Sequence, residues 1–181
     1  AQSQLKAYDP AIEALVTGRD LVVDNDPLLA SFWTSLGDTY HSAGRHDRSD
    51  EAFDQALRLD PRNATTLNNY AYYLSLRGEK LERAREMSEQ SNKLAPGQTS
   101  FEDTFAWVLH RMGRHTEART WIEKALASGG ATSGEVVEHY GDILYALGDH
   151  AGAVEQWRKA LALGGASEAI GSKVSSGRPA E

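Results

Sequence analysis

The chain of 181 residues contains no cysteine, which excludes disulfide frameworks, cysteine-based zinc sites and thiol nucleophiles. It is also poor in positive charge, because 19 lysines and arginines stand against 26 acidic residues, for a net charge of −7. Nucleic-acid binding depends on basic side chains that neutralise phosphates, so we expect no nucleic-acid partner. No apolar run approaches the roughly 18 residues of a membrane span, so we expect no membrane insertion. No signal peptide is visible, and a cytoplasmic and a periplasmic location both stay open.

Small residues recur along the chain at a nearly constant interval. They are separated by 34, 35 and 35 residues, and each is followed seven residues later by a glycine. The small residues are Gly37, Ala71, Ala106 and Gly141, and the glycines that follow them are Gly44, Gly78, Gly113 and Gly148. A fixed period of about 20–50 residues is the signature of stacked supersecondary units. The pattern predicts a repeat protein whose function lies along the repeated surface.

Residues 30–63 show the repeat unit most clearly. Apolar residues at the three-and-four spacing of amphipathic helices occur on both sides of Gly44. We expect Gly44 to end the first helix in a left-handed conformation, and Asp47 to cap the second helix with its side chain. Asp60-Pro61 should stop that second helix, because proline lacks an amide hydrogen. The predicted unit is a helix, a tight turn and a second helix.

This unit resembles the tetratricopeptide repeat, a helical hairpin of about 34 residues. The first copy carries the resemblance at Trp33, Leu36, Gly37, Tyr40, Phe53, Ala56 and Pro61, and three further copies fit with some drift. The resemblance implies an all-α fold, a right-handed α-solenoid of stacked helix-turn-helix repeats. The repeats are expected at 30–63, 64–98, 99–133 and 134–166. An N-terminal capping helix or half repeat would occupy 1–29, and a C-terminal cap with a frayed tail would occupy 167–181.

The N-terminal region is expected to form a helix without a complete partner. Asp9-Pro10 should cap and open a helix that runs to about Val23, after a helix fragment around Gln4–Tyr8. This helix has an apolar face made of Ile12, Leu15, Val16 and Leu21. An apolar face without a neighbour is a contact site, so we expect a concentration-dependent homodimer.

Glycine and serine dominate the later connections. The segment 128–134 is predicted to be a long, flexible bend between the third and fourth repeats. After Gly164-Gly165, Ser167–Val174 should form a short capping turn. Ser175–Glu181 should be a frayed tail.

The six histidines do not indicate a metal site. His46, His115 and His150 each follow a turn glycine by two residues, where the resemblance implies a planar side chain packed between two helices. The other three lie on first helices and lack the i, i+4 spacing of a helical zinc site. No Gly-x-Ser-x-Gly elbow or phosphate-binding loop is present. We therefore predict no metal, no cofactor and no enzymatic activity.

The remaining chemistry is recognition. The resemblance implies that first helices line a concave groove, with groove residues six and three before each small residue, and one, four and five after it. The predicted peptide-binding residues are Asp38, His41, Asn68, Tyr72, Asp103, Trp107, His110, Arg111, Glu138, Asp142 and Tyr145. With Glu135, the groove holds five carboxylates, one arginine and three large aromatic rings. This composition favours a protein or peptide ligand that is basic or neutral and carries apolar side chains.

Three functions follow from these patterns. The leading prediction is a non-enzymatic scaffold that binds a peptide or a partner helix in the acidic, aromatic-containing groove. The others are a self-assembly module that acts through the N-terminal helix, and an interaction domain cut from a larger enzyme. An alternative for the groove is that Trp107 and Tyr72 pack within the array while the acidic residues keep the surface soluble.

Overall fold

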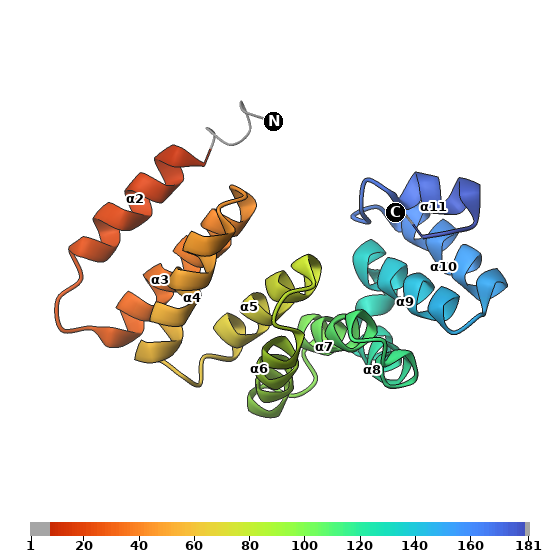
Figure 1. The fold of residues 1–181 in the computed structure, drawn as a ribbon, viewed down its shortest axis with the longest axis horizontal. Helices are drawn as coiled ribbons and strands as arrows, with labels where there is room; N and C mark the ends of the chain where they lie inside the picture. Colours follow the sequence, from red (N-terminus) through yellow and green to blue (C-terminus); the bar gives the residue numbers. More distant parts are fainter. Residues whose placement is uncertain (1–7, 180–181) are drawn as a thin grey trace.

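The computed structural model describes residues 8–179, and all regular secondary structure in that range is helical (Figure 1). Four hairpins form an open arc: α3 (Asp26–Ser42) with α4 (His46–Leu59), α5 (Ala64–Arg77) with α6 (Leu81–Leu94), α7 (Thr99–Arg111) with α8 (His115–Ala127), and α9 (Gly134–Ala146) with α10 (His150–Leu163). Helix α2 (Asp9–Asp20) lies at one end of the arc and α11 (Ile170–Ser176) at the other. The molecule is an α-solenoid.

The turns within the hairpins follow the prediction in their glycines. Gly44, Gly78, Gly113 and Gly148 have φ angles of 69°, 70°, 77° and 88°. This left-handed conformation costs glycine little, and the chain reverses within three residues in each hairpin. The predicted cap by Asp47 is wrong, because the N-cap residue of α4 is Arg45 and no side chain caps that helix. Asp47 lies instead in the first turn, where a negative charge favours the helix N-terminus.

The recurring small residues mark the closest contacts between paired helices. A Cβ atom on Gly37 would lie 2.8 Å from the Phe53 ring, and one on Gly141 would lie 2.5 Å from Cδ1 of Trp157. Ala71 and Ala106 are completely buried. A large side chain therefore packs against the small residue of each hairpin, either from the second helix of that hairpin or from the next hairpin. Each of these sites has room for at most a methyl group.

The core continues from one hairpin to the next. One buried cluster joins Phe53 of α4, Tyr70 of α5 and Val108 of α7. Ser49 adds a polar contact, because its hydroxyl donates a 2.8 Å hydrogen bond to the Gly37 carbonyl across the first hairpin. Since no hairpin buries its apolar surface alone, stability depends on the contacts between neighbours.

Helix α2 corrects two expectations. It begins at Asp9 after the N-cap residue Tyr8, with no side-chain cap, and it ends at Asp20 rather than Val23. Its apolar face is largely covered, because Ile12 is buried with Leu36 and other residues of the first hairpin, and Leu15 and Val16 pack on the same cluster. Only Leu21 of that face is strongly exposed, at 77%. The fragment expected around Gln4–Tyr8 lies, apart from Tyr8, outside the described residues.

The segment between α8 and α9 is mostly exposed, apart from the buried Gly130. It contains the 3₁₀ turn η1 (Gly130–Thr132). Two of its glycines allow close backbone approach, because a Cβ atom on Gly130 would lie 2.7 Å from the Ala125 carbonyl oxygen, and one on Gly134 would lie 2.0 Å from that of Gly164. The expected frayed tail is partly wrong, because Ser175 and Ser176 belong to α11. Residues 180–181 lie outside the described range.

Candidate binding site on the concave face

A cavity of about 910 Å³ is lined mainly by residues of α5, α7, α9 and the C-terminal segment 165–179. Helices α5, α7 and α9 lie along the inner side of the arc (Figure 1). It brings together seven of the eleven predicted site residues: Tyr72, Trp107, His110, Arg111, Glu138, Asp142 and Tyr145. The other four, Asp38, His41, Asn68 and Asp103, do not line it. The groove positions of the second to fourth repeats therefore converge, and those of the first repeat lie apart from this cavity.

The carboxylates of the fourth repeat hold a lysine of the same chain. Lys173 Nζ lies 2.8 Å from Oε1 of Glu138 and 2.7 Å from Oδ2 of Asp142. Ser167 also donates to Glu138, from its amide at 2.6 Å and from its hydroxyl at 2.5 Å. Trp157 Nε1 donates to Asp142 at 3.0 Å. All donors to these two carboxylates come from α10 or from the segment that follows it.

Burial and the ammonium group act in opposite directions on the two acids. Burial favours the neutral form of Glu138, but the hydrogen bonds from Lys173 and Ser167 outweigh it and lower the pKa of Glu138. Asp142 is more strongly desolvated, so burial raises its pKa in spite of the same lysine. The lysine therefore opposes the effect of desolvation on both carboxylates.

The other groove carboxylates also have partners within the chain. Asp103 accepts a 2.9 Å hydrogen bond from His139 Nδ1, and both side chains are buried. Burial alone would lower the pKa of His139, but the charge of Asp103 and its hydrogen bond outweigh burial and raise it. Asn69 donates to Asp38 at 3.1 Å. The groove is therefore not an open row of negative charge, because its acids join one repeat to the next.

Glu135 and Tyr72 make the same kind of contact over a longer range. Tyr72 of the second repeat donates a 2.6 Å hydrogen bond to Glu135 of the fourth. Burial raises the pKa of Tyr72, and the hydrogen bond to Glu135 adds to that rise. Both residues line the cavity, and their hydrogen bond joins α5 to α9.

The aromatic side chains pack within the array and also line the cavity. The indole of Trp107 stacks on His139 with ring centroids 4.2 Å apart, and on His110 at 5.1 Å. Tyr145 stacks on His150 at 4.4 Å. Trp107 therefore contributes to the packing of repeats three and four and also borders the cavity. Leu76, from a predicted groove position, is 38% exposed and gives the cavity an accessible aliphatic wall.

The histidines after the turn glycines contact the end of the preceding first helix. His46 lies 5.2 Å from the ring of His41, and His115 lies 4.9 Å from that of His110. As predicted, these rings pack against the first helix of their own hairpin, although His46 and His150 are exposed. Burial first, and then the neighbouring histidine, lowers the pKa of both His41 and His110 to about 4.

Two of the predicted residues have mainly structural contacts. His41 stacks on Tyr73 with centroids 3.8 Å apart. Asn68 is 6% exposed and donates to its neighbour Asn69 at 3.4 Å. Arg111 borders the cavity, and its Nη1 donates to the Leu76 carbonyl at 3.1 Å, at the C-terminal end of α5. A cation at that helix end is electrostatically favourable.

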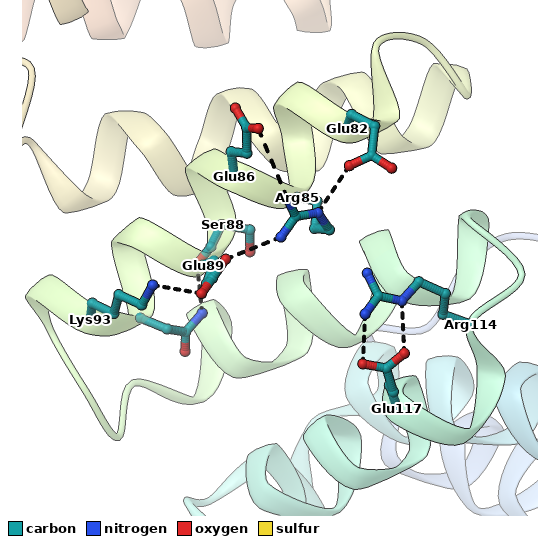
Figure 2. A network of polar contacts seen from close by, with 9 residues as sticks. Glu82, Arg85, Glu86, Ser88, Glu89, Lys93, Arg114 and Glu117 are labelled. Atoms are coloured by element: carbon teal, nitrogen blue, oxygen red, sulfur yellow. Dashed lines mark hydrogen bonds and ion pairs between the residues drawn. The ribbon is translucent and has the colours of Figure 1, made fainter.

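The outer face carries a different kind of charge pattern (Figure 2). On α6, Arg85 pairs with Glu82 and Glu89, and Lys93 pairs with Glu89. At the start of α8, Arg114 makes two 2.7 Å contacts with Glu117. These pairs are exposed and lie within one turn of a helix, so each stabilises the fold little. On the inner face, by contrast, the pair of Asp103 with His139 and the pairs of Lys173 with Glu138 and Asp142 are buried.

Sequence reasoning missed the residues that come from beyond the fourth repeat. Ala166, Ser167 and Lys173 line the cavity, and so does His139, which lies outside the expected groove positions. One signal was available, because a further step of 35 residues from Gly141 reaches Ser176, in α11. Helix α11 is too short to show the hydrophobic period of a first helix.

Among residues 8–179, no three histidine or carboxylate side chains are grouped in a way that would hold a metal ion. Within the same range, no helix combines the length and the apolar character needed to cross a bilayer.

The stacked hairpins define a helical-repeat protein with a cavity on its concave side. The sequence profile of the tetratricopeptide repeat matches residues 22–163, and the chain belongs to this family. Proteins of this family mediate protein–protein interactions, and the fold is typically that of a non-enzymatic scaffold.

Known proteins of this family share the sequence pattern and the fold. The chain is 31% identical over 86 residues to the TPR repeat-containing protein PA4667 of Pseudomonas aeruginosa, and this match covers 48% of the chain and 14% of that relative. Similar solved structures include TTC0263, a thermophilic TPR protein of Thermus thermophilus, with a TM-score of 0.76, 16% identity and coverage of 97% and 93% of the two chains. PilF of Pseudomonas aeruginosa has a TM-score of 0.67, 20% identity and coverage of 93% and 80%. At these identities the solved structures support the fold alone.

Proposed function

We propose that this protein is a non-enzymatic scaffold that binds a segment of a partner protein in the cavity between α5, α7, α9 and the C-terminal segment. The cavity volume of about 910 Å³ carries this proposal. It falls within the roughly 300–1,000 Å³ of small-ligand sites and is large enough for one or two side chains of a peptide. Two other cavities on the described residues are smaller, at about 500 and 360 Å³.

Apolar contact is the main source of affinity in this proposal. Leu76 and Tyr145 offer accessible apolar surface, and the neighbouring carboxylates are already hydrogen-bonded within the chain. A ligand with a large apolar side chain gains the most free energy there, because buried apolar area dominates such contacts. The ligand is basic or neutral, because Glu135, Glu138 and Asp142 leave no place for a further negative charge.

Selection of peptides from a phage-displayed random library tests this function. We expect the selected peptides to contain large apolar residues and to bind the Leu76→Ser variant at least about tenfold more weakly, since the loss of one buried leucine side chain costs about 1.5–3 kcal/mol. Leu161→Ser is the matched control, because Leu161 is 50% exposed on α10 and does not line the cavity. Equal binding to wild type and Leu76→Ser, or selection of acidic peptides, would reject the proposal.

Self-association is a second candidate function. Leu21 and Val23 are each 77% exposed and Leu28 is 46% exposed, close together in the sequence around the turn from α2 to α3. Exposed apolar surface of this kind favours association. Sedimentation at rising concentration should show a dimer that Val23→Ser weakens. A protein that stays monomeric throughout would exclude this candidate.

A further inference from the structure

Two carboxylates on one face of α9 form a built site for an ammonium group. Glu138 and Asp142 are four residues apart, so their side chains lie one helical turn from each other. Both contact the same Nζ atom at 2.8 and 2.7 Å, and their side chains are only 4% and 8% exposed. Two buried carboxylates at this distance require a cation, because either one left alone would lie uncompensated in a poorly hydrated site.

The chain itself supplies the cation from a short helix. Helix α11 has seven residues and follows Gly164 and Gly165, whose φ angles are 76° and 72°. It is anchored by Ile170, which is 7% exposed and packs in one cluster with Val137, Leu144 and Trp157. Lys173 comes three residues after Ile170, so the apolar anchor and the ammonium group lie on the same face of α11.

We propose that α11 is an internal ligand of the groove, and that the partner segment recognised here is a helix that carries an apolar residue followed three residues later by lysine. This inference rests on the proposed function, because it names the ligand of the same cavity. The partner helix takes the place of α11, with its apolar residue at the Ile170 position and its lysine between Glu138 and Asp142.

The charges of the site favour replacement of α11 by a partner helix over undocking of α11 alone. Removal of Lys173 without replacement leaves both carboxylates without their cation, whereas a partner lysine restores every charge contact. A neutral helix fills the apolar position but leaves Glu138 and Asp142 unpaired, so the site discriminates in favour of lysine. The two glycines permit the segment to swing away without strain in the rest of α10, because glycine adopts either sign of φ at little cost.

Because α11 occupies the groove, it should also weaken the binding of an external helix. A tethered segment competes at a high effective concentration, so the wild-type protein binds an external copy weakly. If the internal lysine is lost, α11 is no longer a good occupant and the external helix meets an available site.

Fluorescence anisotropy with a labelled peptide of residues 164–179 tests the proposal on the full chain. We expect the Lys173→Met protein to bind this peptide at least about tenfold more tightly than wild type does, because the internal competitor is weakened. The same peptide with Lys173→Met should lose that binding. Lys159→Met, a change at an exposed lysine of α10, is the matched control and should bind like wild type.

Equal affinity of wild type and Lys173→Met for the peptide would overturn the inference, and so would equal binding of the lysine-free peptide. If Lys173→Met does not fold, hydrogen exchange on the wild type decides. Amides of α11 should exchange through a local opening, before those of α9, and exchange of both only on global unfolding would show that α11 never leaves the site. Leu76-dependent binding of library peptides together with a negative result here would leave the proposed function standing and reject this inference alone.

Discussion

Loss of the Lys173 ammonium group should destabilise the C-terminal end of the array more than loss of any exposed lysine. Lys173 is 7% exposed and contacts two buried carboxylates, so Lys173→Met leaves Glu138 and Asp142 without their shared cation. Breaking a buried ion pair by removing one partner costs about 3–5 kcal/mol. The loss of stability cannot exceed the free energy with which α11 docks onto α9. If the loss were larger, α11 would undock and water would reach both carboxylates.

The predicted loss is measurable by thermal and urea unfolding. For a chain of this length, each kcal/mol shifts the melting temperature by about 2–4 °C, so the full loss corresponds to roughly 6–20 °C. The deficit should shrink as the pH falls from about 7 toward 4. Burial raises the folded-state pKa of Asp142 even with the lysine present, and loss of the lysine removes an opposing effect. The folded variant therefore takes up a proton at Asp142 before the unfolded chain does and gains stability at lower pH.

Lys159→Met provides the comparison, since Lys159 is exposed on α10. A Lys173→Met protein that unfolds at the same temperature as this control, with unchanged hydrogen exchange in α11, would refute the argument that the cation holds the two carboxylates in place.

Three other changes test the packing and the buried polar groups. Gly141→Ala should cost about 1–3 kcal/mol, because its methyl group would lie 2.5 Å from an indole ring, whereas Gly171→Ala in α11 meets no atom within 4 Å and should not lower stability. Ala106→Leu, at a completely buried helix contact, should also cost about 1–3 kcal/mol in urea unfolding. The pKa of His139 is raised in the folded state, so its pairing with Asp103 stabilises below pH 6.5 and is lost as the pH rises through that higher value. Asp103→Asn should therefore cost more stability at about pH 6 than at about pH 9.

Each of these predictions has an outcome that contradicts it. For the packing changes, Glu117→Ala is the surface control, because Glu117 is exposed and pairs only within the first turn of α8. If Ala106→Leu melted like this control, the assignment of the close helix contacts would be wrong. A pH-independent effect of Asp103→Asn would show that the charge of His139 contributes nothing to stability.

The fold was predictable because its determinants are local and periodic. Gly37 and Gly141 mark helix contacts at one fixed spacing, and Gly44 and Gly148 mark the turns, so the hairpins can be placed before any long-range contact is known. Helix caps were less predictable. Aspartate is a common N-cap residue, but Asp47 lies two residues after the actual N-cap, Arg45. The position at which a helix begins after a turn glycine is not fixed to within two residues by the sequence pattern.

The cavity was predictable only in part. The repeat register placed Trp107 and Tyr145 on the inner face, because they follow the small residues of their repeats by one and by four positions, both of them expected groove positions. It did not show that the carboxylates have partners within the chain. Asp103 meets His139, and Glu138 meets Lys173, through contacts between residues 35 and 36 positions apart in sequence. Neither pairing has a local pattern, and composition alone suggested an open acidic groove.

The hydrogen bonds between groove residues of neighbouring repeats determine which repeat can follow which along the chain. Asp103 of the third repeat is matched by His139 at a defined position of the fourth, where the third repeat itself carries Thr104. A tandem duplication of the third repeat would place a threonine opposite the buried carboxylate, which supplies a hydroxyl but no positive charge. Although the hairpins share one shape, they are not exchangeable modules. New members of such an array must therefore arise together with the polar residue that their neighbour requires.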